Sequence, residues 1–268
     1  MKLVAIVQPV ARPDEAARAV ADAAALTLAE ARMRLAPEPP ALLARLEPGR
    51  ADLLVLALRK AGLAALAVDA RCPTDEDRVV ARGFALDGAG VTLTPRFGDP
   101  VTFAWAEVLA VLRCVRASRT ETRRTEKTKR FSAGAAVLSG GLKLTRTSTT
   151  TERSSQEELE QVILVYARDG RAATLAEREL DFSCLGTGMQ PTSTGNMVEL
   201  ARRLRERATG AFHDDRLVRL GRRPLPFLAA AESRSSTGAS ATTRTDTSSS
   251  LDTLAEVMRR ALAEGLLP

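Results

Sequence analysis

At the start of the chain, segments with the apolar pattern of a strand are followed by segments with the apolar pattern of a helix. Residues 3–7 are an unbroken apolar run, which is typical of a buried strand. Pro13 then stands where a helix begins, and an Ala-rich segment follows. Thr27, with Glu30 three residues later, predicts the capping box of a second helix, which the prolines of residues 37–40 end. The pattern predicts one strand followed by two helices.

The next residues complete a small domain. Residues 41–46 predict a short strand, and residues 51–62 predict a helix that is apolar around most of its circumference, with Gly62 as its C-cap. Residues 63–70 predict a closing strand. We therefore expect residues 1–72 to form a β-α-α-β-α-β domain that folds without the rest of the chain.

This domain resembles a known family. The segment TLAEARMRL, a proline-rich turn, a strand and a helix ending RKAG before an apolar strand look like the C-terminal domain of the bacterial ribosomal stalk protein. The resemblance covers about 70 of the 268 residues and implies the fold. In that family the first helix carries lysines that contact translation factors, whereas this chain has only Arg18 there. The matching positions are Leu28, Glu30, Ala31, Arg32, Ala61 and Gly62.

After residue 76 the periodicity changes from helical to β. The runs at 79–86, 91–94 and 101–105 are separated by Gly-, Asp- and Pro-containing turns, which predicts a meander of antiparallel strands. Residues 106–115 are long enough for a helix, but their β-branched content and position after a hairpin favour a strand. Residues 161–167 predict a further strand.

An amphipathic helix is predicted over residues 196–210, with Leu200 and Leu204 on its apolar face. Short strands, a hairpin at Trp105 and this final helix resemble a pleckstrin-homology-like antiparallel barrel or sandwich, assigned to residues 77–220. Members of that class bind phosphoinositides or peptides, so the resemblance implies a binding fold without fixing its ligand. The fold class predicted for the whole chain is α+β.

The last part of the chain predicts a tethered helix. Residues 221–250 are expected to form a flexible linker, because residues 232–250 are polar and of low complexity. Residues 251–268 predict a short amphipathic helix whose apolar face must be covered. We expect it to dock on a partner, while docking in a groove of this protein or permanent packing on its own barrel stays open. The face comprises Leu251, Leu254, Val257, Met258, Ala261 and Leu262.

The net charge of +6 is concentrated in one short stretch. Residues 113–130 hold eight basic and two acidic residues, so the rest of the chain sums to zero. They begin a basic loop predicted over residues 113–155, which either binds an anionic partner or is a solvated mobile segment. Aromatic residues, which support the binding of single-stranded nucleic acid, do not alternate with the basic ones. The candidate anion-binding residues are Arg113, Arg116, Arg119, Arg123, Arg124, Lys127, Lys129 and Arg130.

Candidate catalytic chemistry is sparse. His213 is the only histidine, and no second imidazole or thiolate stands at metal-ligand spacing from it. The glycines at 186 and 188 match neither the dinucleotide nor the phosphate-loop pattern, which favours a structural turn. We therefore predict no catalytic residue, no metal and no cofactor. The odd number and wide spacing of the cysteines favour a reducing compartment: Cys72, Cys114 and Cys184.

These observations predict a non-catalytic cytoplasmic adaptor or scaffold, which binds protein partners through two small domains and a tethered C-terminal helix. The alternatives are a peripheral binder of anionic lipid surfaces, through the barrel and the basic loop, and a ribosome- or nucleic-acid-associated factor. No apolar run approaches the roughly 18 residues of a membrane-spanning helix, so we expect no transmembrane segment. The partner, the pathway and the oligomeric state are not encoded in any motif that we find.

Overall fold

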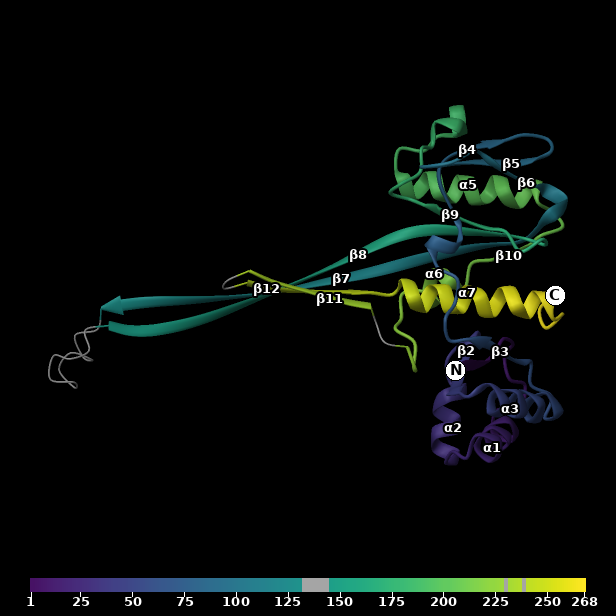
Figure 1. Ribbon diagram of the computed structural model, residues 1–268, viewed down its shortest axis with the longest axis horizontal. Helices are drawn as coiled ribbons and strands as arrows, with labels where there is room; N and C mark the ends of the chain where they lie inside the picture. The colour runs from purple at the N-terminus through teal and green to yellow at the C-terminus, as the bar shows by residue number, and fades with distance from the viewer. Residues whose placement is uncertain (132–144, 229–230, 238–239) are drawn as a thin grey trace. The chain divides into compact units, whose positions relative to one another are not determined.

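A computed structural model of the chain has a mixed α+β architecture, with a large sheet and several helices (Figure 1). This agrees with the predicted fold class. The structure describes residues 1–131, 145–228, 231–237 and 240–268.

The chain divides into two compact units, and strands β7 (Val108–Phe131) and β8 (Thr145–Ala167) contribute residues to both. The first unit comprises Met1–Arg116, Leu159–Ala230 and Thr247–Pro268, and the second comprises Ala117–Glu158 and Ala231–Asp246.

The first unit begins with a small sheet in which β2, β1 and β3 are neighbours and both pairings are antiparallel. Val4, Ile6 and Leu43 on one face pack with helices α1 to α3, while Leu3 and Leu66 point to the opposite face. The predicted capping box at the start of α2 is present. The elements follow the predicted order: β1 (Lys2–Ile6), α1 (Pro13–Ala24), α2 (Leu28–Leu35), β2 (Ala41–Leu46), α3 (Pro48–Lys60) and β3 (Ala65–Asp69).

The large sheet of the first unit orders its strands β10-β7-β8-β9-β4-β5-β6. The antiparallel meander predicted over residues 79–105 is present, because β4 pairs with β5 and β5 pairs with β6, both antiparallel. Two other pairings, β4 with β9 and β10 with β7, are parallel, so the sheet as a whole is not the antiparallel one that was expected. The elements are η1 (Asp75–Asp77), β4 (Val79–Leu86), β5 (Gly90–Pro95), β6 (Val101–Ala104), η2 (Trp105–Glu107), β9 (Ala172–Ala176), η3 (Ser183–Gly188), α5 (Ser193–Arg207), β10 (Phe212–Asp214) and α6 (Leu217–Leu220).

The large sheet curls around helix α5 without closing. Phe103 of β6, Ile163 of β8 and Leu200 of α5 belong to one apolar cluster, so strands from both parts of the sheet contact the same helix (Figure 1). In the described residues β6 and β10 remain at opposite ends of the strand order. Of the expected barrel or sandwich, a closed barrel is therefore wrong for this part of the chain.

Helix α7 (Ser248–Ala263) lies between the small sheet and the large sheet (Figure 1). Every residue from 250 to 258 is buried, and one apolar cluster joins this helix to Leu3 and Leu66 of the small sheet and to Leu112 and Leu164 of the large one. Of the alternatives left open by the sequence, packing within this protein is the one observed. The six residues expected to bind a partner contact this core instead: Leu251, Leu254, Val257, Met258, Ala261 and Leu262.

Because α7 covers the second face of the small sheet, the structure does not separate the chain at residue 72. A fragment ending there would expose Leu3, Leu66 and Val68, which are at most 3% exposed in the complete chain. The expectation that residues 1–72 fold alone therefore omitted one of the two layers that cover their sheet.

Two segments predicted to be irregular contain strands instead. The expected linker at 221–250 contains β11 (Ala231–Thr237) and β12 (Ser240–Asp246), which pair with one another, and β12 also pairs with β7. All the described residues of the expected loop at 113–155 lie in β7 and β8. Both segments are rich in threonine, whose β-branched side chain favours extended backbone.

We predict that Leu254→Ala lowers the free energy of unfolding by about 2–5 kcal/mol, because the Leu254 side chain is 1% exposed between two sheets and its loss leaves a cavity. The matched control is Leu53→Ala at a position that is 69% exposed, where we expect a change within about 0.5 kcal/mol. Urea unfolding followed by circular dichroism measures both. Equal effects of the two substitutions would contradict the central position of α7.

Candidate functional site

A polar hollow in the second unit is formed by strands β7, β8 and β12. Side chains two residues apart on a strand point to the same face, so Arg119, Glu121 and Arg123 of β7 share one face. On β12, Thr243 lies opposite Glu121, and Ala241 lies opposite Arg123. The strand register thus places charged and hydroxyl side chains side by side.

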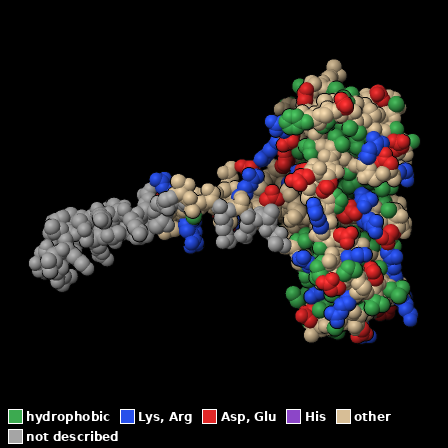
Figure 2. Space-filling view, in the orientation of Figure 1, with side chains coloured by type: hydrophobic (Ala, Val, Ile, Leu, Met, Phe, Trp, Pro, Cys, Tyr) green, Lys and Arg blue, Asp and Glu red, His purple; other side chains and the backbone are tan. Residues whose placement is uncertain are grey.

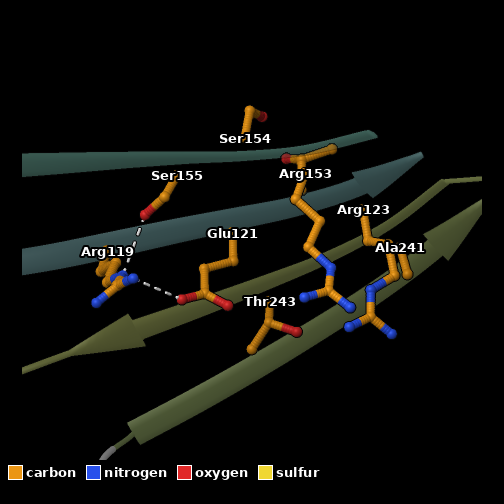
Figure 3. A pocket seen from close by; sticks show the side chains of 9 residues that line it. Arg119, Glu121, Arg123, Arg153, Ser154, Ser155, Ala241 and Thr243 are labelled. Carbon is orange, nitrogen blue, oxygen red and sulfur yellow. Dashed lines mark hydrogen bonds and ion pairs between the residues drawn. The ribbon is translucent and has the colours of Figure 1, made fainter. Parts of the chain in front are cut away.

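Strand β8 adds a third arginine to this face (Figure 3). The Arg119 Nε group donates a hydrogen bond to the Ser155 Oγ atom at 3.1 Å, and Arg153 extends from β8 over the same hollow. The hollow has a volume of about 500 Å³. Its lining residues are Arg119, Glu121, Thr122, Arg123, Arg153, Ser154, Ser155, Ala241 and Thr243.

The hollow carries an excess of positive charge, because Glu121 is the only carboxylate among its lining residues. That carboxylate forms an ion pair with Arg119, with an Nη2–Oε1 distance of 3.0 Å. Figure 3 draws no hydrogen bond or ion pair from Arg123 or Arg153 to the other residues of the hollow, so within the hollow Glu121 pairs with Arg119 and not with these two guanidinium groups.

Guanidinium and hydroxyl groups in this arrangement are donors for an anion. Each guanidinium presents a planar set of N–H groups that matches two oxygens of a phosphate or carboxylate, and serine and threonine hydroxyls donate further hydrogen bonds. The Arg119 side chain is 61% exposed, so a large ligand can reach it without any opening of the fold. Solvent exposure also makes binding through this face sensitive to salt.

Two of the predicted anion-binding residues lie in the first unit and do not line the hollow. Arg113 pairs with Asp215, with an Nη1–Oδ2 distance of 3.3 Å, and Arg116 pairs with Asp75 at 2.7 Å. Both arginines lie on the part of β7 that belongs to the first unit, where neighbouring positions are in the core. The prediction treated them as members of one exposed loop and is wrong for these two positions.

Arg116 belongs to a buried charge network that also contains Arg78. Asp75 accepts a hydrogen bond from Thr174 as well as from Arg116, and Arg78 is 3.6 Å from the same carboxylate. The Arg78 Nη1 group donates to the Asp252 carboxylate of α7 at 2.5 Å. This network connects α7 to the large sheet through charges that have partners, which is the condition for stable burial.

The remaining predicted residues fall in the second unit. Arg119 and Arg123 line the hollow, and Arg124 is exposed and adjacent to Arg123 on the strand, so it points to the opposite face. The side chains of Lys127, Lys129 and Arg130 lie outside the described ones.

Arg153, Ser155 and Thr243 were missed in the sequence, although all three line the hollow. Arg153 lies 30 residues after Arg123, and only the pairing of β7 with β8 brings them together. The available signal was the high threonine content of both polar segments, which is typical of strands. That signal predicts strands, but it does not predict their register.

Other candidate groups have structural partners. The His213 Nε2 atom lies 2.9 Å from the backbone oxygen of Ala208. Burial raises the pKa of Cys72 to about 11 and also raises the pKa of Cys114. Within the described residues, no group of potential ligands comes together as a metal site, and no helix is both long and apolar enough to cross a membrane.

Comparison of the chain with protein-family models, with curated proteins and with solved structures gave no match in any of the three.

We predict that Asp75→Asn destabilises the protein at neutral pH but not in acid. Burial would raise the pKa of Asp75, but hydrogen bonds and the positive charge from Arg116, with a further hydrogen bond from Thr174, hold it below its ordinary value. The ionised Asp75 carboxylate therefore contributes fully to the free energy of unfolding above the ordinary aspartate pKa of about 3.9. This contribution is lost as the pH falls through the lowered pKa of Asp75 in the folded protein.

Urea unfolding of both proteins between pH 7 and pH 3 tests this prediction. The difference in unfolding free energy should stay constant down to about pH 5 and shrink below about pH 4. Asp52→Asn is the control, since the Asp52 side chain is 64% exposed and its ion pair with Lys2 is 3.6 Å long. A difference that grows in acid would contradict the assigned pairing.

Proposed function

We propose that this protein is a non-catalytic binding protein, and that the arginine and hydroxyl face of its second unit binds a phosphate-bearing partner. The proposal depends on one observation: Arg119 and Arg123 of β7 and Arg153 of β8 line the same hollow. Ser155 and Thr243 add hydroxyl groups to the same face. Arginine and hydroxyl donors of this kind are typical contacts of phosphate oxygens.

The distribution of charge supports this choice of surface. On the face that Figure 2 shows, acidic and basic side chains of the first unit are interspersed. Residues 113–130 hold the whole excess of positive charge, and most of them belong to the second unit. A local excess of one sign attracts an oppositely charged partner more effectively than a mixed surface does.

The environments of Cys72, which is half-buried, and Cys114, which is buried, support the non-catalytic part of the proposal. A thiolate is the reactive form of cysteine, and the raised pKa values of Cys72 and Cys114 keep both thiols protonated at neutral pH. The wide spacing of the cysteines also supports a reducing compartment, and we place the protein in the cytoplasm on this ground.

In this proposal the C-terminal helix is no longer the element through which an adaptor would bind a protein partner. Its tethered helix is part of the core, so a partner protein would have to contact another surface. Leu53 and Leu56 of α3 offer one, because they are 69% and 66% exposed. The stalk-like assignment of residues 1–72 rests on matching positions such as Leu28 and Glu30 as well as on element order, whereas the pleckstrin-homology-like assignment of residues 77–220 rests on element order alone. We retain both as proposals about the fold.

The experiment compares retention of two full-length variants on a heparin column. We expect Arg119→Gln, Arg123→Gln and Arg153→Gln together to elute at a clearly lower salt concentration than the unmodified protein, because three phosphate- or sulfate-binding groups are lost. The control removes the same charge from exposed positions of the first unit: Arg12→Gln, Arg50→Gln and Arg219→Gln.

Equal shifts for the two variants would mean that net charge alone determines retention, which would overturn the assignment of the hollow. Circular dichroism spectra of the two variants should match that of the unmodified protein, since all six side chains are exposed. A matching spectrum shows that a loss of retention is not a loss of folding.

A further inference from the structure

We infer that the ligand of the hollow is a sugar bisphosphate, a compound in which hydroxyl groups lie between two phosphates. One phosphate contacts Arg119, the other contacts Arg123 and Arg153, and a hydroxyl group between them donates a hydrogen bond to the Glu121 carboxylate. This inference rests on the proposed function and names the class of compound that carries the phosphates. It gives a role to the carboxylate, which a site for phosphate alone does not need.

The charges of the hollow follow a fixed order along the sheet. Arg119, Glu121 and Arg123 are separated by two residues each on β7, so they share one face at intervals of roughly 7 Å. Figure 3 shows Arg119 on one side of the Glu121 carboxylate and the guanidinium groups of Arg123 and Arg153 on its other side. The hollow therefore presents one positive charge, then a carboxylate, then two further positive charges.

The guanidinium group of Arg119 is held in place at its end of the hollow. Its Nε group donates a hydrogen bond to the Ser155 Oγ atom at 3.1 Å, and its Nη2 atom lies 3.0 Å from the Glu121 Oε1 atom. A guanidinium group has five N–H donors, which is more than these two contacts require. Because the side chain is already positioned, less conformational entropy is lost when a phosphate binds to it.

The opposite end of the hollow suits the second phosphate. Arg123 of β7 and Arg153 of β8 both reach this end (Figure 3). Neighbouring guanidinium groups repel one another, and a phosphate that accepts hydrogen bonds from both of them removes this repulsion. Ala241 lies opposite Arg123 on β12, and its short side chain leaves space beside the arginine.

Glu121 determines which kind of bisphosphate fits. A carboxylate between two phosphate positions repels a continuous chain of phosphates, because like charges side by side weaken binding. The same carboxylate accepts hydrogen bonds from sugar hydroxyl groups, as acidic side chains do from ribose in dinucleotide sites. A carboxylate has about four acceptor positions, so its ion pair with Arg119 leaves positions for a hydroxyl group. The order of groups in the ligand is therefore phosphate, hydroxyl, phosphate.

The other side chains and the size of the hollow suit the same compound. The hydroxyl groups of Ser155 and Thr243 both donate and accept hydrogen bonds, which matches sugar hydroxyls as well as phosphate oxygens. The volume of about 500 Å³ lies within the range of small-molecule sites, which extends from roughly 300 to 1,000 Å³. The lining residues thus offer a partner to each kind of polar group in a free sugar bisphosphate.

Two bisphosphates that differ in the groups between their phosphates test the inference. Fructose 1,6-bisphosphate and hexane-1,6-diyl bisphosphate both carry phosphates at the ends of six carbons, but only the first has hydroxyl groups between them. Isothermal titration calorimetry with the full-length protein at low salt measures both affinities. We expect the sugar compound to bind about tenfold more tightly, the effect of one hydrogen bond to a charged group. Equal binding, or tighter binding of the hexane compound, would overturn the inference.

Glu121→Ala separates the role of the carboxylate from a general effect of charge. This variant loses the repulsion of phosphate, so the hexane compound should bind more tightly, but it also loses the acceptor for the sugar hydroxyl, so the preference for the sugar compound should disappear. Misfolding would instead weaken both. An equal gain for both compounds would show that Glu121 only offsets the charge of the arginines, and the inference would be wrong.

The control for this variant is Glu15→Ala in the first unit. Glu15 also pairs with an arginine, Arg12, at 3.2 Å, and its side chain is 66% exposed. We expect this variant to keep the tenfold preference of the unmodified protein, because Glu15 does not line the hollow. A loss of preference in the control would contradict the assignment to Glu121.

A ligand that lacks one phosphate tests the two ends of the hollow. Fructose 6-phosphate should bind the unmodified protein about tenfold more weakly than the bisphosphate, because one charged contact is lost. Arg119→Gln should lose most of this difference, since only the phosphate position at Arg123 and Arg153 remains. Arg50→Gln, at an exposed position of the first unit, should keep it. An undiminished difference in Arg119→Gln would contradict a phosphate position at Arg119.

RNA contains the same sugar and phosphate groups within a polymer, so a short single-stranded RNA is titrated into the unmodified protein and into Glu121→Ala. We expect the free sugar bisphosphate to show the dependence on Glu121. If only the affinity for RNA depends on Glu121, the hydroxyl groups belong to a polymer, and the inference of a free compound is overturned.

The outcomes also distinguish this inference from the proposed function. If the three-arginine variant loses retention on heparin but the unmodified protein does not prefer the sugar compound, the hollow binds anions and only the class of ligand is wrong. If retention on heparin is unaffected by the three substitutions, the proposed function fails first, and the inference fails with it.

Discussion

The first unit depends on the burial of one helix between two sheets. Every residue of α7 from 250 to 258 is at most 8% exposed. Two of them are charged: Asp252 pairs with Arg78, which directly precedes β4, and Glu256 pairs with Arg259. Apolar contacts hold the helix from both sides, while the ion pairs leave its buried charges with partners, and the one with Arg78 favours one position of the helix. The small sheet, in turn, depends on α7 to cover its second face.

The second unit obeys a different constraint, because its described part is a sheet with no layer packed on it, and such a sheet cannot bury apolar side chains. Among its described side chains, Ala117 alone is buried. Threonine, serine and arginine suit such a sheet, since they favour or tolerate extended backbone and remain solvated on either face. The surface is therefore polar by necessity, and it leaves hydrogen-bond donors available to a ligand. The proposed binding of phosphate groups uses this property.

The two units also use arginine in different ways. In the first unit Arg78 is buried beside Asp252, and Arg116 is half-buried beside Asp75, so both charges are neutralised and stabilise the fold. Arg123 and Arg153 of the second unit share a hollow with fewer carboxylates than guanidinium groups. Along β7, Arg116 thus serves in the core and Arg123 on the proposed binding face, according to whether the strand position is covered.

Local patterns in the sequence were sufficient for the elements of residues 1–72, for the capping box at Thr27 and for helix α5, because their periodicity and caps involve residues close in sequence. The same patterns predicted an apolar face on α7 and an excess of charge near β7. The tertiary structure decided the rest. It determines what covers that face, which threonine-rich segments pair as strands, and which arginines lie together at the hollow. Arg153 reaches Arg123 through strand register, and Asp252 reaches Arg78 across 174 residues, so neither pairing leaves a local signal in the chain.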